Sequence, residues 1–197
     1  MKKQFALSIV LLTVLLPCTA RSKYINFGTA LSSGFNLHSD GDLAKQNPLF
    51  SDSSAARILI GANVDATFCT SDTLQIVAGS DLFCDFHIKD KLYYHTFDYS
   101  FFTGIKIFPN LQGLNFSIAY VLGNRTDFKQ FYDEDEQLIR GYKNTKWGNG
   151  FRLSVEYDFL YDSDSKIIPF AGFYYRHIPR GNNHNDNILS AYIGIRF

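Results

Sequence analysis

The chain has 197 residues and carries nineteen basic and nineteen acidic side chains, so its formal net charge is zero. That balance excludes the basic patch or stripe of a nucleic-acid-binding protein. Aromatic residues make up 16% of the chain, although its mean hydropathy is only −0.10. A chain of this length is sufficient for one domain, and the composition is typical of strands that alternate apolar and polar side chains.

Residues 1–20 have the organisation of a signal peptide. A lysine pair precedes a mostly apolar run over 5–16, Pro17 ends the run, and small residues lead to a cleavage site after Ala20. The run is too short for a transmembrane helix. Lipidation of Cys18 is the other alternative, but Pro17 stands where a small residue is expected. We therefore expect two parts, an exported leader at 1–20 and one barrel domain at 21–197.

The remaining chain alternates in side-chain character with the period of a β-strand. In the segment 151–159, Phe151, Leu153 and Val155 lie on the face opposite to Arg152 and Ser154. The pattern predicts eight strands, an even number as in bacterial outer-membrane barrels. They are 25–37, 57–68, 74–85, 97–107, 114–123, 151–159, 166–177 and 187–197, of which 166–177 has the least clear facing.

The connections between these strands alternate in length. Short segments rich in turn-forming residues lie at 69–72, 109–113 and 161–165. Longer polar segments lie at 37–54, 124–150 and 178–186, whereas the link at 89–91 is short. Periplasmic turns and longer extracellular loops are the outer-membrane pattern, so both ends of the chain are expected at the periplasmic rim.

Side-chain volume decides which face points outward. A secreted soluble barrel of the lipocalin kind would bury the bulky apolar face, but eight strands enclose room only for side chains or one small ligand. The opposite face consists mainly of small or charged residues, which suit that narrow interior. The sequence therefore predicts an all-β fold, an eight-stranded antiparallel up-and-down transmembrane β-barrel in the cell outer membrane, with outer-membrane lipid around it.

The last strand ends abruptly on an aromatic residue. Ile193, Ile195 and Phe197 share one face, while Tyr192 and Arg196 lie on the other. Termini are usually frayed and polar, so this ending is unusual for a soluble domain. It resembles the C-terminal signal strand of outer-membrane barrels, which implies recognition of Ile193, Ile195 and Phe197 by the barrel assembly machinery.

The whole mature chain resembles the small eight-stranded outer-membrane proteins of the OmpW, OmpX and OmpA-barrel type. The resemblance rests on the leader, the strand count, the loop asymmetry and Phe197. OmpW-like proteins imply a narrow channel for small, hydrophobic solutes, which is the first expectation. OmpX-like proteins imply adhesion or a structural role, which is the alternative. No residue motif selects between them, and fold alone does not give function.

Charged residues of both signs fall on the predicted inner face. They form either a polar plug or a gated polar pathway. Pairing of the third and fourth strands would set Asp81 opposite Asp98 or Ser100, and a cation such as Arg152 or Lys106 would then stabilise the carboxylates. The lumen-lining candidates are Arg57, Asp65, Asp81, Asp85, Asp98, Lys106, Arg152, Glu156, Asp158 and Arg196.

Motifs for catalysis or cofactors are weak. The five histidines lack a tight ligand spacing, so no metal or other cofactor is expected. Arg176-His177-Ile178 looks somewhat like a segment of the lipid A deacylases, but Pro179 stands where that family has its nucleophilic serine. We therefore expect that this protein is not an enzyme. The loops at 37–54 and 124–150, the latter with the acidic run 133–136, are candidate sites for a host or surface ligand.

Cys69 and Cys84 are expected to stay unbonded. An exported cysteine pair would suggest a disulfide, but Cys84 lies about twelve residues beyond the turn that Cys69 opens. At 3.3 Å per residue the two are on the order of 40 Å apart along the strand, far beyond the ~7 Å that a disulfide allows between Cα atoms.

Overall fold

The computed structural model describes residues 25–38, 56–69, 71, 73–89, 92–109, 113–132, 137–160, 165–181 and 184–197. The signal peptide expected at 1–20 lies outside the described residues, as do most of the 37–54 connection and the acidic run 133–136. No helix in the described ranges is long and apolar enough to cross a membrane.

Nine β-strands make up the regular structure of the described residues, and all of their pairings are antiparallel. Most strands pair with their neighbours in the chain, but β7 pairs with β5 instead of β6, and the last strand pairs with the first. The strands are β1 Ile25–His38, β2 Ala56–Cys69, β3 Leu74–Lys89, β4 Leu92–Ile107, β5 Leu114–Tyr132, β6 Leu138–Asn144, β7 Gly148–Asp158, β8 Ile168–Gly181 and β9 His184–Arg196.

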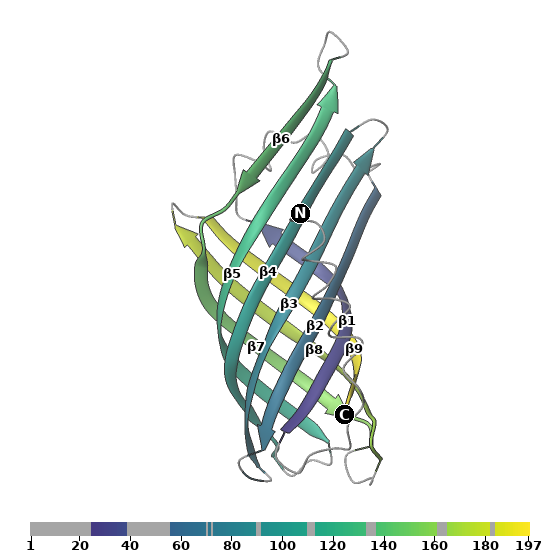
Figure 1. The fold of residues 1–197 in the computed structure, drawn as a ribbon, viewed down its shortest axis with the longest axis vertical. Coiled ribbons are helices and arrows are strands. Elements are labelled where there is room, and N and C mark those ends of the chain that lie inside the picture. Colours follow the sequence, from purple (N-terminus) through teal and green to yellow (C-terminus); the bar gives the residue numbers. More distant parts are fainter. Residues whose placement is uncertain are drawn as a thin grey trace.

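Eight of these strands close into a barrel. The sheet order is β4-β3-β2-β1-β9-β8-β7-β5-β6, and a further β4–β5 pairing joins the two sides of the sheet. The remaining strand, β6, pairs among the described strands with the C-terminal part of β5 alone. It lies beyond the barrel (Figure 1). The predicted fold class, an eight-stranded antiparallel up-and-down barrel, is confirmed, and all eight predicted strands are present.

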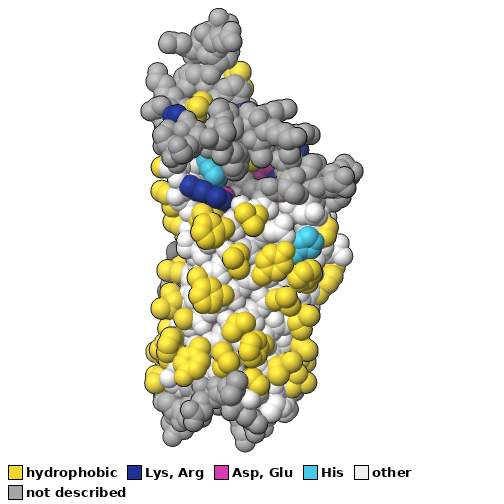
Figure 2. Space-filling view, turned by 180° about the vertical axis from the view of Figure 1, so that it is seen from behind, with side chains coloured by type: hydrophobic (Ala, Val, Ile, Leu, Met, Phe, Trp, Pro, Cys, Tyr) yellow, Lys and Arg dark blue, Asp and Glu magenta, His cyan; other side chains and the backbone are white. Residues whose placement is uncertain are grey.

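The outer wall of the barrel is apolar on every strand. Along β7, buried and exposed residues alternate, with Phe151, Leu153, Val155 and Tyr157 exposed. On the face shown in Figure 2, hydrophobic side chains cover the wall, and charged side chains are visible only toward the upper end of the view. A soluble monomer rarely exposes so much contiguous apolar surface, whereas a lipid-facing band on a closed barrel requires it. The barrel is therefore a transmembrane one.

Two connections are shorter than the sequence analysis expected. The segment 124–150, expected to be a loop, contains the outer part of β5 and the whole of β6, which form a hairpin above the barrel. The segment 178–186 is largely strand, because β8 runs to Gly181 and β9 starts at His184. Beyond the lipid both faces of a strand are solvated, so the apolar alternation that signals a strand disappears there.

The interior of the barrel also contains more large aromatic side chains than the sequence predicted. Phe83, Phe102, Phe170 and Tyr192 are all buried inside the barrel, where small and charged residues were expected to dominate. Each lies beside an inward glycine. A Cβ atom added to Gly61, Gly79, Gly194 or Gly172 would come within 2.6–2.8 Å of one of these rings. Missing side chains on one strand thus make room for aromatic rings on another, in the manner of aromatic rescue.

The two cysteines of the barrel are free, as the sequence predicted. Cys69 pairs with Gln75 at one end of the β2–β3 ladder, while Cys84 pairs with Ile60 nine residues further along β3. The ladder between them keeps the two thiols apart.

A charge on the lipid-facing wall tests this orientation. Phe101 is 56% exposed on β4, and Phe101→Arg should lower the free energy of unfolding in phospholipid vesicles by ~2–4 kcal/mol. Tyr142→Arg on β6, outside the barrel, is the matched control and should cost about 0–1 kcal/mol. Urea titration measures both. Equal costs would mean that the Phe101 face is not in lipid.

Candidate functional site

The lumen contains three levels of paired polar groups. The level at the end of the barrel where β1 starts and β9 ends gathers residues from β4, β7 and β9. Glu156 receives both Lys106 Nζ at 2.8 Å and Arg196 Nη2 at 2.6 Å, and the Tyr192 hydroxyl donates to its other oxygen at 3.2 Å. Arg196 Nη1 also bonds Asp158 Oδ1 at 2.6 Å. All five side chains are buried, so the last strand is tied to β7 across the interior.

The middle level is a cation held between aromatic rings. The Arg152 guanidinium carbon lies 4.5 Å from the ring centres of both Phe102 and Tyr174. Its Nε is 3.4 Å from Asp81 Oδ2, and Asn63 donates a hydrogen bond to the same carboxylate. Asp81 pairs in register with Ser100, one of the two partners expected for it, and the nearby cation is Arg152. The arginine fills the width of the lumen instead of lining an opening.

The third level lies at the opposite end of the barrel, away from the start of β1 and the end of β9. Arg176 bonds Asp98 Oδ1 and Ser100 Oγ, both at 2.6 Å, and Arg180 Nη2 lies 3.2 Å from the other Asp98 oxygen. Asp186 forms ion pairs with both Arg180 and Arg125. This Arg–Asp cluster joins β4, β5, β8 and β9, so neither side of the barrel can move away at this end without breaking buried ion pairs.

The remaining three candidates from the sequence, Arg57, Asp65 and Asp85, lie at the margins of these levels. Arg57 Nη2 lies 2.8 Å from Asp85 Oδ2, and His87 Nε2 lies 3.0 Å from the other oxygen of that carboxylate. Arg57 is partly exposed, with 32% of its side-chain surface accessible. Asp65 is half-buried and accepts a hydrogen bond of 3.2 Å from Thr67 Oγ1.

Free space between the first and the middle level is small. The cavity there measures about 10 Å³ and is bordered by Asp65, Lys106, Arg152, Glu156 and Tyr192, among others. One water molecule needs roughly 10–15 Å³ when volume is measured this way. The described side chains therefore plug the barrel at this height.

Several charged residues of the lumen were not among the candidates predicted from the sequence. Arg125 and Asp127 lie on the inward face of β5, in phase with Ser117 and Gly123, but they fall within the segment expected to be a loop. Continuing the two-residue period past Gly123 would have found them. The other missed residues are His87, Arg176, Arg180 and Asp186.

The β5–β6 hairpin is fixed to the Arg–Asp cluster at its base. Arg125 bonds Asp127 Oδ1 at 2.8 Å, and its backbone N–H donates to Thr145 Oγ1 at 3.0 Å. Arg180 Nη1 donates to the carbonyls of Gly123 and Lys146 at 2.7 and 3.2 Å. The two strands of the hairpin thus rise from a buried ionic base and are held at a set angle to the barrel.

Aromatic side chains line the outer face of this hairpin and continue onto the barrel. Ring centres lie 5.8 Å apart for Phe86 and His95, 5.6 Å for His95 and Phe128, and 5.3 Å for Phe128 and Tyr142. They border an open groove of about 400 Å³. The row extends beyond the barrel onto β6, where all seven residues are exposed.

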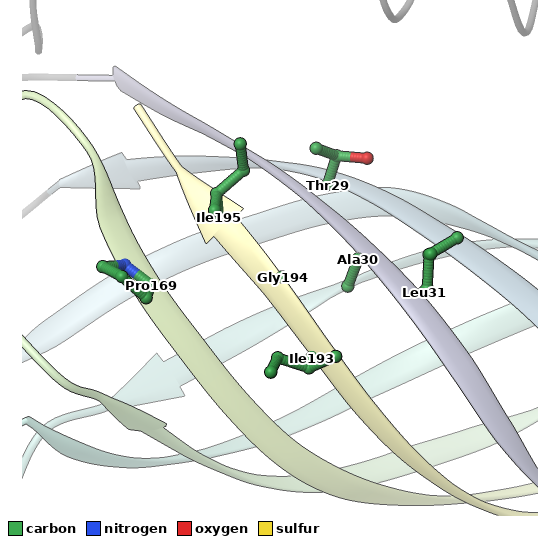
Figure 3. Close-up of a pocket in the computed structure, with 7 residues that line it drawn as sticks. All are labelled: Thr29, Ala30, Leu31, Pro169, Ile193, Gly194 and Ile195. Carbon is green, nitrogen blue, oxygen red and sulfur yellow. The ribbon is translucent and has the colours of Figure 1, made fainter.

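A second surface groove lies on the lipid-facing wall over the β1–β9 seam (Figure 3). It measures about 370 Å³ and runs between Leu31, Pro169, Ile193 and Ile195, with Gly194 as its floor. In a transmembrane barrel such a groove is filled by acyl chains. Phe197 closes the seam, because its backbone exchanges two hydrogen bonds with Phe27 at 2.8 and 2.9 Å.

No protein-family model matches the chain, and no curated protein matches its sequence. Solved structures of outer-membrane barrels do resemble this protein. Ail, the attachment invasion locus protein of Yersinia pestis, is 12% identical, with 88% of this chain and 97% of that chain covered and a TM-score of 0.50. Neisserial surface protein A is 13% identical over 88% and 94% of the two chains, with a TM-score of 0.44. OprG from Pseudomonas aeruginosa is 12% identical over 87% and 92%, with a TM-score of 0.45.

At these identities the likeness is one of fold. It agrees with the closed sheet and the apolar wall: the chain has the fold of the small eight-stranded outer-membrane β-barrels.

Breaking the Arg–Asp cluster should be costly. Asp98→Ala leaves the fully buried Arg176 without its carboxylate, and a loss of ~3–5 kcal/mol in the free energy of unfolding is expected. Lys143→Ala, at an exposed charge on β6, should change stability little. Removing both partners, as Asp98→Ala with Arg176→Met, should cost less than the sum of the single changes. Additive effects in vesicle unfolding would show that the pair is not coupled.

Proposed function

We propose that this protein is an integral outer-membrane barrel of the OmpX type, which presents the β5–β6 hairpin at the cell surface for binding. The observation that carries the proposal is the combination of a plugged lumen with a protruding hairpin anchored on buried ion pairs. In the outer-membrane pattern the ends of the chain are periplasmic, so the hairpin is extracellular.

The hairpin has the properties of a preorganised binding element. Its base is held by Arg125 and Arg180, so little conformational entropy is lost when a partner binds. Tyr142 is 64% exposed and Trp147 49% exposed, and Arg140 is exposed between them and the hairpin tip. Tyrosine, tryptophan and arginine are the residues that most often carry binding energy at interfaces.

A narrow channel for small hydrophobic solutes, the first expectation from the sequence, has less support. A path through the lumen would have to displace Arg152 from between Phe102 and Tyr174 and separate Arg176 from Asp98. Each step would leave a buried charge without its partner, which is strongly unfavourable. Lipid A modification has less support too, because Pro179 stands where the lipid A deacylases have their nucleophilic serine.

Conductance and adherence separate these functions. Refolded wild-type protein in planar bilayers should give no steady openings, with or without small apolar solutes. Bacteria that display the protein should adhere to host cells or matrix more than bacteria in which an Asn-Gly turn replaces residues 128–142, a loop that suits a two-residue hairpin. Steady conductance steps, together with unchanged adherence of the shortened variant, would favour the channel.

Recognition of the last strand by the assembly machinery stays a prediction. Phe197→Asp should sharply lower the amount of barrel in the outer membrane, because it removes the resembled signal and puts a charge at the lipid-facing seam. Phe197→Tyr, which keeps the aromatic ring, is the control and should assemble well. Heat-modifiable mobility on gels measures the folded fraction in each membrane preparation. Normal levels of the Asp variant would contradict the role of Phe197.

A further inference from the structure

Among the described strands, the outer edge of β6 has no partner, and β6 lies beyond the barrel. The sheet order ends at β6, and Leu138–Asn144 pair with β5 alone among the described strands. All seven residues are exposed. Barrel closure pairs both sides of the other strands along most of their length, whereas no described strand pairs with the second side of β6 (Figure 1).

The alternation of hydrogen-bonded residues along the β5–β6 ladder shows which backbone groups of β6 face this edge. The N–H of Thr145 donates to the carbonyl of Arg125 at 2.8 Å, in the same register that pairs Asp127 with Lys143. In an antiparallel ladder every second residue bonds the neighbouring strand, and the residues between them point their N–H and C=O the other way. The residues whose N–H and C=O face the open edge are therefore Leu138, Arg140, Tyr142 and Asn144.

We propose that this edge pairs with the β6 edge of a second copy of the chain in an opposing membrane, which forms an antiparallel β6–β6 ladder around a two-fold axis at Gly141. The inference rests on the proposed surface-binding function and names its partner. In this register every edge-facing residue meets another edge-facing residue. Arg140 stands opposite Tyr142 of the second copy, and Leu138 stands opposite Asn144.

Side-chain chemistry favours this register. Arg140 and Tyr142 point to the same face of the ladder, so the two-fold axis creates two reciprocal contacts between a guanidinium and an aromatic ring, an attractive cation–π geometry. On the other face, Lys143 meets Ile139. A two-residue slip that centres the axis on Arg140 would set two arginines directly opposite each other, which is unfavourable. Arg140 and Lys143 also discourage indiscriminate pairing with other edges, as charges on edge strands do.

The direction of β6 determines whether the two copies lie in the same membrane or in two facing membranes. In two upright copies in the same membrane, both β6 strands run from the hairpin tip toward the bilayer, so they cannot be antiparallel. A two-fold axis perpendicular to the sheet reverses the barrel along with the strand, which places the second copy in a facing membrane. Seven residues extend over roughly 23 Å, and many such weak pairs between two surfaces would add up through multivalency.

Disulfide trapping at the two-fold axis tests the proposal. Gly141 tolerates a side chain, because an added Cβ meets nothing closer than 3.8 Å. In the proposed ladder the two Gly141 Cα atoms form a non-hydrogen-bonded pair about 4.5 Å apart, within disulfide range. Lys143→Cys on the same strand is the matched control, because two copies of that residue would be about 13 Å apart. Both variants carry Cys69→Ser and Cys84→Ser.

Two bacterial populations, each displaying the same variant with a different tag, are mixed under mild oxidation. We expect dimers that carry both tags for Gly141→Cys and none for Lys143→Cys. Tyr142→Pro removes an edge donor while it leaves the β5–β6 bonds intact, so it should reduce the Gly141→Cys dimer to background. Dimers confined to one population, or equal crosslinking by both cysteine variants, would overturn the proposal.

The outcome also separates this inference from the proposed function. If no dimer with both tags forms while the shortened hairpin still loses adherence to host cells or matrix, the surface-binding function holds and self-pairing is wrong. If replacement of residues 128–142 changes neither adherence nor clumping of the bacteria, both fail.

Discussion

Backbone hydrogen bonding in lipid is the constraint on which this structure depends. No water is present in the bilayer core, so each N–H and C=O there must find a partner within the protein, and a sheet can meet that condition only by closing. The β4–β5 and β1–β9 pairings complete the closure, with Phe197 bonded to Phe27 at its end. The edge of β6 that no described strand pairs with lies beyond the barrel, where water can satisfy its N–H and C=O groups.

Closure with eight strands then dictates the chemistry of the interior. The lumen is so narrow that charged side chains must pair with one another or with aromatic rings. Arg152 does so with Asp81, Phe102 and Tyr174, and Glu156 does so with Lys106 and Arg196. These contacts leave about one water's volume between the Glu156 and Arg152 levels, so the same pairing that makes the barrel stable argues against a channel.

Most of the barrel could be predicted from the sequence, because lipid on one side and a narrow lumen on the other impose a strict two-residue period. The strand prediction failed where a strand does not have lipid on one face and small or polar lumen residues on the other. In β6 both faces are solvated, so Leu138–Asn144 show no alternation. In β8 both faces carry bulky residues, such as Phe173 outward and Tyr174 inward, so its facing was unclear. Pairing of Arg125 with Asp186 depends on contacts between distant strands, which a local period cannot reveal.

Thiol labelling on β7 tests the central claim, a sealed lumen with lipid outside, most directly. Single cysteines at Ser154, buried and facing inward, and at Val155, exposed on the outer wall, differ by one position in the chain. Both are placed in the Cys69→Ser, Cys84→Ser background and treated in vesicles with a charged or a lipid-soluble maleimide. The account predicts that Val155→Cys reacts only with the lipid-soluble reagent and Ser154→Cys with neither. Rapid labelling of Ser154→Cys by the charged reagent would contradict it, because that result requires a water-filled lumen.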